Sequence, residues 1–198
     1  MAEGSDPTDA RVTRAAQPLV CALGDRAPDV GAARFLAPGA VVVGDVTLGR
    51  GTSVWYACVL RGDSASITVG EDVNIQDGCI LHADPDFPTT VGDRVSLGHG
   101  AIVHGATVED DVLIGMRATV LNGARIGSGS LVAAGAVVRP GTVVPPGSLV
   151  AGVPAQVRRP VSDEERAIIL RTPTVYGGLA DVHRAAMLGD AASRPPTG

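Results

Sequence analysis

The feature of this 198-residue chain that most constrains its fold is an aliphatic residue that recurs every six positions. All nineteen repeat positions are Val, Ile or Leu, and a glycine often follows directly, as in Leu48-Gly49. The spacing changes at only three steps: three residues are inserted after Leu60, four are inserted after Leu81, and the step after Val103 is shortened to five. The repeat positions are Leu36, Val42, Leu48, Val54, Leu60, Val69, Ile75, Leu81, Val91, Leu97, Val103, Val108, Ile114, Val120, Ile126, Val132, Val138, Val144 and Val150.

A period of six matches neither an α-helix nor the two-residue alternation of a simple strand. Hexapeptide repeats are typical of a β-helix, in which each unit buries its aliphatic residue against its neighbours. Three hexads make one triangular coil, so the repeat predicts an all-β solenoid, a parallel β-helix of about six coils. A β-sandwich with glycine-rich turns is the alternative, but it would not keep one phase over so many units. The 26 glycines and 14 prolines suit the corners of such a prism.

Both ends of the chain fall outside the repeat, which divides the sequence into four segments. Residues 1–15 are small, polar and charged, without the apolar core of a signal peptide, and we expect them to be disordered. Residues 16–160 form the predicted β-helix. Residues 161–189 are expected to form helices that pack on the solenoid and cover it. Residues 190–198 are expected to be a disordered tail.

The start of the helical segment carries a recognisable signal. Ser162 and Glu165 have the spacing of a capping box, in which each side chain accepts a hydrogen bond from the other residue's backbone. This pattern predicts a helix over about 163–171. Pro173 then predicts a break, followed by a second helix that ends near Leu188.

Charge and cysteine content exclude several classes of function. The net charge is −5 and no basic cluster is present, which argues against a nucleic-acid partner. No stretch is long enough to cross a membrane. The three cysteines are odd in number and lack the spacing of a disulfide or zinc framework. We therefore expect Cys58 and Cys79 to be small buried residues, and the protein to be cytoplasmic.

Three of the four histidines, His82, His99 and His104, lie within 23 residues of one another. On a triangular coil, Arg61, His82 and His104 each follow the leading aliphatic residue of the same face. They are therefore predicted to form one column with steps of about 4.8 Å. Asp77 and His99 occupy equivalent slots on another face and form a second column.

One prism cannot easily bring all three imidazoles to a single ion. His99 is five residues from His104, an extended path on the order of 15 Å, whereas two nitrogens that bind one zinc lie no more than about 4 Å apart. Two prisms side by side can combine His82 and His104 of one chain with His99 of the next. A closed ring of such contacts gives a homotrimer with three interfacial sites. Three neutral imidazoles would leave a position for water, as in catalytic sites; the alternative is that each histidine is a hydrogen-bonding corner residue.

Eight short motifs surround these residues. They are Val54-Trp55, Val59–Asp63, Asn74–Gly78, Leu81-His82, Gly98–Gly100, Val103–Gly105, Ile114–Met116 and Ala151–Ala155. Together they resemble the gamma-class carbonic anhydrase family, over about residues 30–185. The resemblance implies a left-handed β-helix assembled as a trimer, with zinc, iron or cobalt between the subunits. It implies that the metal ligands are His82, His99 and His104, with His99 from the neighbouring chain.

The resemblance also implies catalytic roles for four other residues. Gln76 matches the family's water-orienting amide, Arg61 and Asp63 match its Arg–Asp pair, and Asp77 matches its interface carboxylate. Arg61 is too permanently charged to be a base, so a bidentate bridge to Asp63, or across the interface to Asp77, suits it better. The alternative for Arg61, Asp63 and Asp77 is that they hold the trimer together without a catalytic role.

Packing or turn chemistry is a sufficient explanation for several neighbouring residues. We expect Trp55 and Tyr56 to pack at the subunit interface and Asn74 to serve a turn. Tyr176 resembles a family tyrosine that approaches the site, and a packing role explains it equally well.

The chain departs from the family pattern at two places. Arg117 replaces the second glycine of the usual Ile-Gly-Met-Gly-Ala, and it could bind bicarbonate or lie on the exterior. Ser64 stands where the archaeal type has a proton-shuttling glutamate, and the loop 83–90 offers only Asp84 and Asp86 as acids. Fast hydration needs a proton relay as well as a hydroxide, so slow activity is expected.

Three functions remain open at this point. The first is reversible hydration of carbon dioxide to bicarbonate by a metal-bound hydroxide, with zinc as the first candidate and ferrous iron or cobalt as alternatives. The second is an acyltransferase or thioesterase of the hexapeptide type. Such transferases generally rely on one catalytic histidine, so three ligand-spaced histidines count against it. The third is a non-catalytic metal-binding trimer with an assembly or scaffold role.

Overall fold

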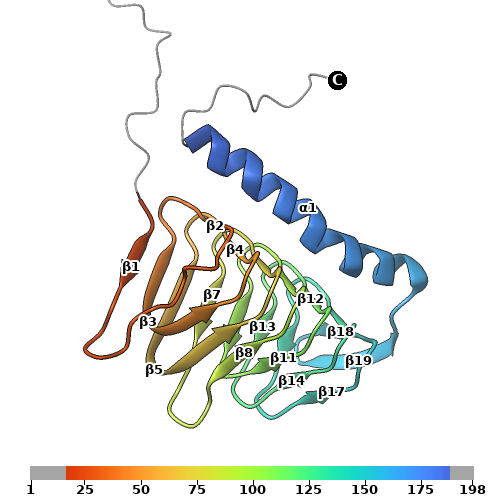
Figure 1. The fold of residues 1–198 in the computed structure, drawn as a ribbon. Coiled ribbons are helices and arrows are strands. Elements are labelled where there is room, and N and C mark those ends of the chain that lie inside the picture. Colours follow the sequence, from red (N-terminus) through yellow and green to blue (C-terminus); the bar gives the residue numbers. More distant parts are fainter. Residues whose placement is uncertain (1–16, 188–198) are drawn as a thin grey trace, which may run out of the picture.

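The computed structural model describes residues 17–187 and shows a parallel β-solenoid with one long helix along its side (Figure 1). Short strands turn around three faces, and each strand pairs in parallel with strands one coil away. This confirms the parallel β-helix that the repeat predicts, and it is consistent with the left-handed form that the family resemblance implies. The two segments expected to be disordered, 1–15 and 190–198, lie outside the described residues.

The first face, here called the helix face, is covered by helix α1 (Asp163–Met187). It has seven parallel strands, because the series of hexads both begins and ends on this face. The solenoid therefore has about seven turns, close to the six expected when the nineteen hexads are grouped three to a coil. The strands are β2 (Phe35–Leu36), β4 (Ser53–Val54), β6 (Asn74–Ile75), β9 (Ser96–Leu97), β12 (Leu113–Ile114), β15 (Leu131–Val132) and β18 (Ser148–Gly152).

The second face, here called the histidine face, begins with the first halves of two long strands. Its register places Arg61 beside His82 and His82 beside His104, which confirms the predicted column. The strands are β3 (Val41–Leu48), β5 (Val59–Val69), β7 (Ile80–His82), β10 (Ile102–His104), β13 (Thr119–Val120) and β16 (Val137–Val138).

The third face takes the second halves of β3 and β5, because both strands continue around a corner. It continues in β8 (Thr89–Val91), β11 (Thr107–Val108), β14 (Arg125–Ile126) and β17 (Val143–Val144). At the N-terminal end, β1 (Leu19–Cys21) pairs with β3. At the other end, β19 (Ala155–Pro160) pairs antiparallel with β18.

The aliphatic ladder of the repeat forms the core. Eighteen of the nineteen repeat residues are at most 2% exposed, and only Leu36, in the first coil, is partly buried. Cys58 and Cys79 are fully buried in the same core, as predicted for small interior residues. The Cys58 thiol donates a hydrogen bond to the carbonyl of Gln76 at 3.0 Å. The interior is therefore a continuous column of side chains that ties each coil to the next.

Helix α1 begins at the predicted capping box but does not break where we expected. The Glu165 N–H donates to Ser162 Oγ at 3.2 Å, and the Ser162 N–H donates to the Glu165 carboxylate at 2.7 Å. The prediction of two helices is wrong, because one continuous helix runs through Pro173. Pro173 is buried together with Ile169 and Ala180. This packing offsets the roughly 3 kcal/mol that proline costs inside a helix.

An aromatic cluster fixes α1 to the helix face. Trp55 is 4% exposed, and its ring lies edge-on to Tyr176 and His183 with ring centroids 5.3 and 5.0 Å apart. The Tyr56 hydroxyl and Nδ1 of His183 are hydrogen-bonded at 2.8 Å. The expected subunit contact is wrong for Trp55, because its own chain already buries it.

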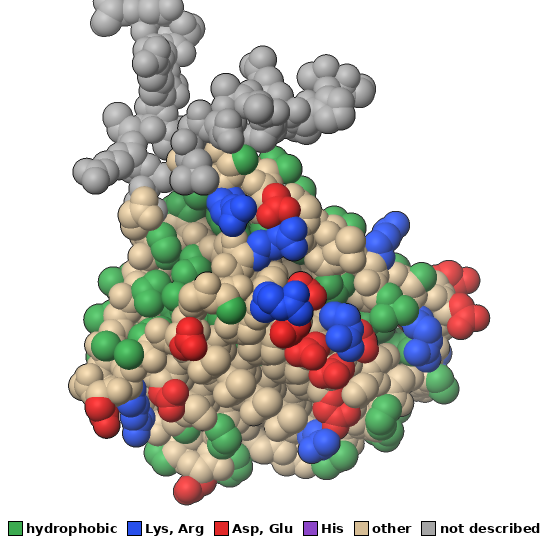
Figure 2. Space-filling model, viewed as in Figure 1, with side chains coloured by type: hydrophobic (Ala, Val, Ile, Leu, Met, Phe, Trp, Pro, Cys, Tyr) green, Lys and Arg blue, Asp and Glu red, His purple; other side chains and the backbone are tan. Residues whose placement is uncertain are grey.

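On the face seen in Figure 2, basic and acidic side chains lie next to one another in the centre, and others are scattered towards the edges. Arg34 forms a bidentate pair with Asp181 of α1, at 2.9 and 2.6 Å. Arg94 pairs in the same way with Asp111, at 2.7 and 3.0 Å. The carboxylates neutralise these arginines.

Within residues 17–187, no helix is long and apolar enough to span a bilayer.

Two neighbouring isoleucines of α1 provide a test of this packing. Ile169 is 2% exposed and Ile168 is 45% exposed. We expect Ile169→Ala to lower the free energy of unfolding by about 2–4 kcal/mol because it leaves a cavity. The matched control Ile168→Ala should change it by less than about 0.5 kcal/mol. Urea denaturation followed by far-ultraviolet circular dichroism measures both, and equal losses would contradict the described packing of α1.

Candidate metal centre

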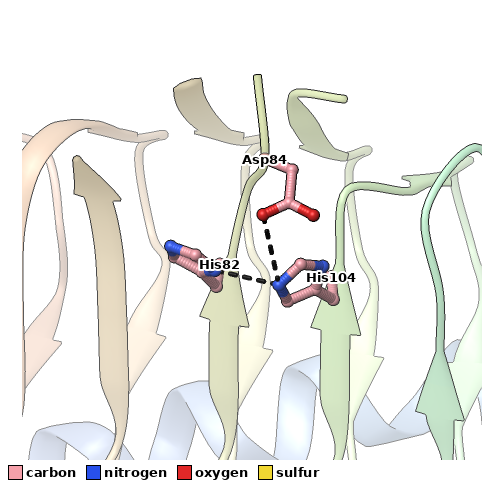
Figure 3. Close-up of side chains that lie close together, drawn as sticks. All are labelled: His82, Asp84 and His104. Atoms are coloured by element: carbon pink, nitrogen blue, oxygen red, sulfur yellow. Dashed lines mark hydrogen bonds and ion pairs between the residues drawn. The ribbon is translucent and has the colours of Figure 1, made fainter. Parts of the chain in front are cut away.

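His82 and His104 face each other at the ends of β7 and β10 (Figure 3). Nδ1 of His82 lies 2.9 Å from Nε2 of His104, and both side chains are partly buried. With Zn–N bonds of about 2.0–2.1 Å, two nitrogens on one tetrahedral ion are about 3.3 Å apart. A small opening of the pair would therefore admit an ion. The structure brings together the two histidines that the sequence placed in one column.

Asp63 and Arg61 hold the other side of His82. Oδ1 of Asp63 lies 3.0 Å from Nε2 of His82, and the second oxygen of Asp63 pairs with the Arg61 guanidinium. Burial alone would raise the pKa of Asp63, but hydrogen bonds from His82 and Arg61, with the Arg61 charge, lower that pKa to about 2. The carboxylate is therefore ionised at neutral pH and fixes the ring of His82. Arg61 thus pairs with Asp63 within the chain, but through one guanidinium nitrogen and not as the expected bidentate bridge.

Asn122 holds the other side of His104. Nδ1 of His104 lies 2.6 Å from Oδ1 of Asn122, and Nδ2 of Asn122 donates to the Asp84 carboxylate at 2.8 Å. The other Asp84 oxygen lies 4.0 Å from Nε2 of His104 (Figure 3). His82, Asp84 and His104 thus offer ligand atoms that all lie within 4.8 Å of one another.

His99 lies apart from this group, at the corner between the helix face and the histidine face. Its Nδ1 pairs with Asp77 at 2.9 Å, and its Nε2 is hydrogen-bonded to the Tyr176 hydroxyl at 3.3 Å. Burial and the charge of Asp77 raise the pKa of Tyr176. The Asp77–His99 contact confirms that these residues stack in one column. That a neighbouring chain supplies His99 to His82 and His104 stays a prediction.

Gln76 and Asn74 form a buried pair of amides beside the His99 column. Gln76 is 5% exposed, and its Nε2 donates to Oδ1 of Asn74 at 3.0 Å. Nδ2 of Asn74 donates in turn to Ser96 Oγ at 2.7 Å. This chain of donors leaves Oε1 of Gln76 available as an acceptor. The prediction of a turn role for Asn74 is wrong, because it belongs to β6 and orients Gln76.

From the sequence, Asp84 was expected only to be an acidic residue of the loop 83–90, and Asn122 was not expected at the site. The signal for Asp84 is its place in the four-residue insertion that directly follows His82. The signal for Asn122 is weaker: it is a polar residue on the histidine face one coil beyond His104. Arg117 lies beside the site through its backbone, whose N–H donates to the His99 carbonyl at 2.9 Å, while its side chain is exposed.

The donor chemistry of the group suits a divalent cation of intermediate softness. Imidazole nitrogens bind zinc, iron and cobalt, and a carboxylate oxygen is accepted by all three. Both imidazoles are also held by hydrogen bonds on their outer sides, as metal-binding histidines generally are. The residues present therefore fit a metal ion, although they do not select one element.

Comparison with known proteins identifies the family of this chain. Residues 105–140 match the family model described as bacterial transferase hexapeptide (six repeats). The chain is 52% identical over 146 residues to the probable carbonic anhydrase of Methanocaldococcus jannaschii, covering 74% of this chain and 92% of that protein. It is 46% identical over 167 residues to gamma carbonic anhydrase 1, mitochondrial, of Arabidopsis thaliana. That match covers 81% of this chain but only 61% of the plant protein's length.

The fold has solved relatives as well. A Bacillus cereus protein described as a candidate acetyltransferase superposes with a TM-score of 0.82 and 33% identity, over 85% of this chain and 98% of that one. The extent of the sequence matches is decisive for the family. The chain belongs to the gamma-class carbonic anhydrases.

Alanine variants of the paired histidines test whether these residues bind a metal ion without carrying the fold. His82→Ala and His104→Ala should each lose most of the bound metal but keep the fold, because the aliphatic ladder carries the fold. His183→Ala is the control for metal content alone, since within residues 17–187 His183 belongs to no group that could hold a metal ion and instead bonds to Tyr56. Elemental analysis measures the metal, and circular dichroism measures the fold. Unfolding of the first two variants would mean that the site is structural.

Proposed function

We propose that this protein catalyses the reversible hydration of carbon dioxide to bicarbonate at metal sites shared between the subunits of a homotrimer. The observation that carries the proposal is the pair His82 and His104, with the third candidate ligand, His99, held on another side of the same chain. Relatives named as carbonic anhydrases support it.

The cation is proposed to be zinc, with ferrous iron or cobalt as alternatives. Held at this site, it would lower the pKa of water towards 7 and so supply the hydroxide that hydration needs. Asp63 fixes the ring of His82 through a hydrogen bond of 3.0 Å, and Asp77 contacts Nδ1 of His99 at 2.9 Å. These carboxylates act on the ligands and do not need to touch carbon dioxide.

Gln76 is proposed to orient the reacting groups. Because Asn74 engages its amide nitrogen, its Oε1 presents a fixed acceptor next to the His99 half of the site. A hydrogen bond to this oxygen would hold the attacking group in one orientation. Such positioning lowers the activation free energy of the reaction. Arg61 pairs with the Asp63 carboxylate and serves to hold it in place.

Two other functions share parts of this site. The fold of the Bacillus cereus protein described as a candidate acetyltransferase favours acyl transfer as the second candidate. A metal-binding trimer without catalysis would have the same ligands. Anaerobic purification, metal analysis and a stopped-flow hydration assay on one sample separate them. Metal with hydration supports the proposal, metal without hydration favours the scaffold role, and acyl turnover without metal favours the transferase.

Gln76→Ala should retain metal and lose most of its hydration activity, because the side chain binds no metal and only orients the reaction. We expect a decrease of about 10- to 100-fold in kcat. Gln156→Ala, at an exposed position of β19, is the control that should change nothing. Stopped-flow assays at equal metal content make the comparison. Unchanged turnover in Gln76→Ala would remove Gln76 from the mechanism.

Mixed trimers test the shared site directly. His82→Ala and His99→Ala homotrimers each lack one ligand in all three sites. In any mixed ring, only one junction joins an intact His82 and His104 to an intact His99. Random reassembly of equal amounts makes about three quarters of the trimers mixed, so about one quarter of the wild-type metal content should return.

Metal analysis after demonstrated subunit exchange reads out this result even if hydration is not the function. The alternative is a site completed within one chain by Asp84, which lies next to His104. In that case His99→Ala would keep its metal on its own, and mixing would add nothing. That outcome would sink the interfacial model.

A further inference from the structure

We infer that Asn122 is a positioning residue which, held by Asp84, fixes the tautomer of His104 so that Nε2 is its metal-binding atom. The inference rests on the proposed metal site and is independent of whether that site hydrates carbon dioxide. It assigns a role to two side chains that the repeat does not place in contact.

The hydrogen-bond chain from Asp84 through Asn122 assigns the proton on Nδ1 of His104. A carboxylate oxygen can only accept, so the amide nitrogen of Asn122 must face Asp84, to which it donates at 2.8 Å. Oδ1 of Asn122 therefore faces Nδ1 of His104 at 2.6 Å. A carbonyl oxygen also can only accept, so Nδ1 carries the proton. The lone pair of the neutral ring is then on Nε2, which lies 2.9 Å from Nδ1 of His82.

The loop after β7 is built to hold Asp84 in this place. The Phe87 N–H donates to the Asp84 carbonyl at 3.0 Å, which closes a tight turn. The Thr89 hydroxyl donates to the His82 carbonyl at 2.5 Å and accepts from the Gly105 N–H at 2.9 Å. The loop is thereby bonded to both histidine-bearing strands. The backbone that carries Asp84 is therefore held next to the turn that carries Asn122.

Gly105 leaves the space that Asn122 needs. A Cβ at position 105 would lie 2.4 Å from Oδ1 of Asn122 and 2.8 Å from Cβ of Phe87. Any larger residue there would displace the amide or the loop. Glycine at this position therefore lets the acceptor oxygen reach the ring of His104.

The test measures zinc affinity and the protonation of the ring. Asn122→Leu keeps the volume and removes the acceptor, and we expect zinc to bind about 10- to 100-fold more weakly. Asp84→Ala leaves the Asn122 amide free to rotate and point its NH2 group at His104. This variant should therefore also bind zinc more weakly, but by a smaller factor than Asn122→Leu. Asp86→Ala removes an exposed carboxylate of the same loop and should leave zinc affinity unchanged. Competition with a chromophoric chelator gives the affinities.

Nitrogen NMR of the metal-free protein supplies a readout that a merely structural role would not move. His104 should show one tautomer, protonated at Nδ1, in the wild type, and a mixture in Asn122→Leu. Zinc binding and tautomer unchanged in Asn122→Leu would overturn the inference while leaving the metal site intact. If that variant does not fold, the His104 tautomer in Asp84→Ala decides: a mixture of tautomers supports the inference, and a single tautomer protonated at Nδ1 overturns it. A wild-type protein that binds no zinc would overturn the metal site and the inference together, whereas zinc binding without hydration would overturn only the proposed activity.

Discussion

The in-register stacking of one coil on the next is the constraint on which the rest of the structure depends. Each repeat residue pairs with its counterpart one coil away, and the aliphatic ladder seals the interior. Residues in the same slot of successive hexads therefore become vertical neighbours about 4.8 Å apart. His82 and His104 are 22 residues apart in the chain, yet their ring nitrogens meet at 2.9 Å because of this register.

The same stacking keeps His99 away from the other two histidines. A residue cannot leave its column without breaking the backbone ladder of the coil, and the packed core has no spare volume to permit it. His99 is instead held at its corner by Asp77 and Tyr176. Asp84 can approach His104 only because it belongs to an insertion, and Asn122 already engages its carboxylate.

The parts of the molecule that follow from periodicity could be predicted from the sequence, and those that follow from tertiary packing could not. The coils, the histidine column and the Ser162 capping box are local or repeat-determined. Pro173 gave a wrong helix break because burial against the solenoid outweighs a local rule. The Asn122–Asp84 bond joins residues 38 apart, across an insertion whose path the repeat does not determine. The bond between Tyr56 and His183 spans 127 residues and needs the docked helix.

The irregular steps of the repeat are where the metal centre acquires its supporting carboxylates. Asp63 stands three residues after Leu60, and Asp84 stands three residues after Leu81 on the next coil. Each of them lies in one of the two inserted segments of the repeat. In a regular hexad the chain turns a corner three residues after the repeat residue. No additional residues are then present that could bring a carboxylate back towards a histidine. The insertions provide these additional residues. Asp63 then holds His82 directly, whereas Asp84, in the equivalent slot one coil later, holds His104 through the amide of Asn122. The regular repeat thus places the two candidate ligands His82 and His104, and its interruptions place carboxylates that orient them.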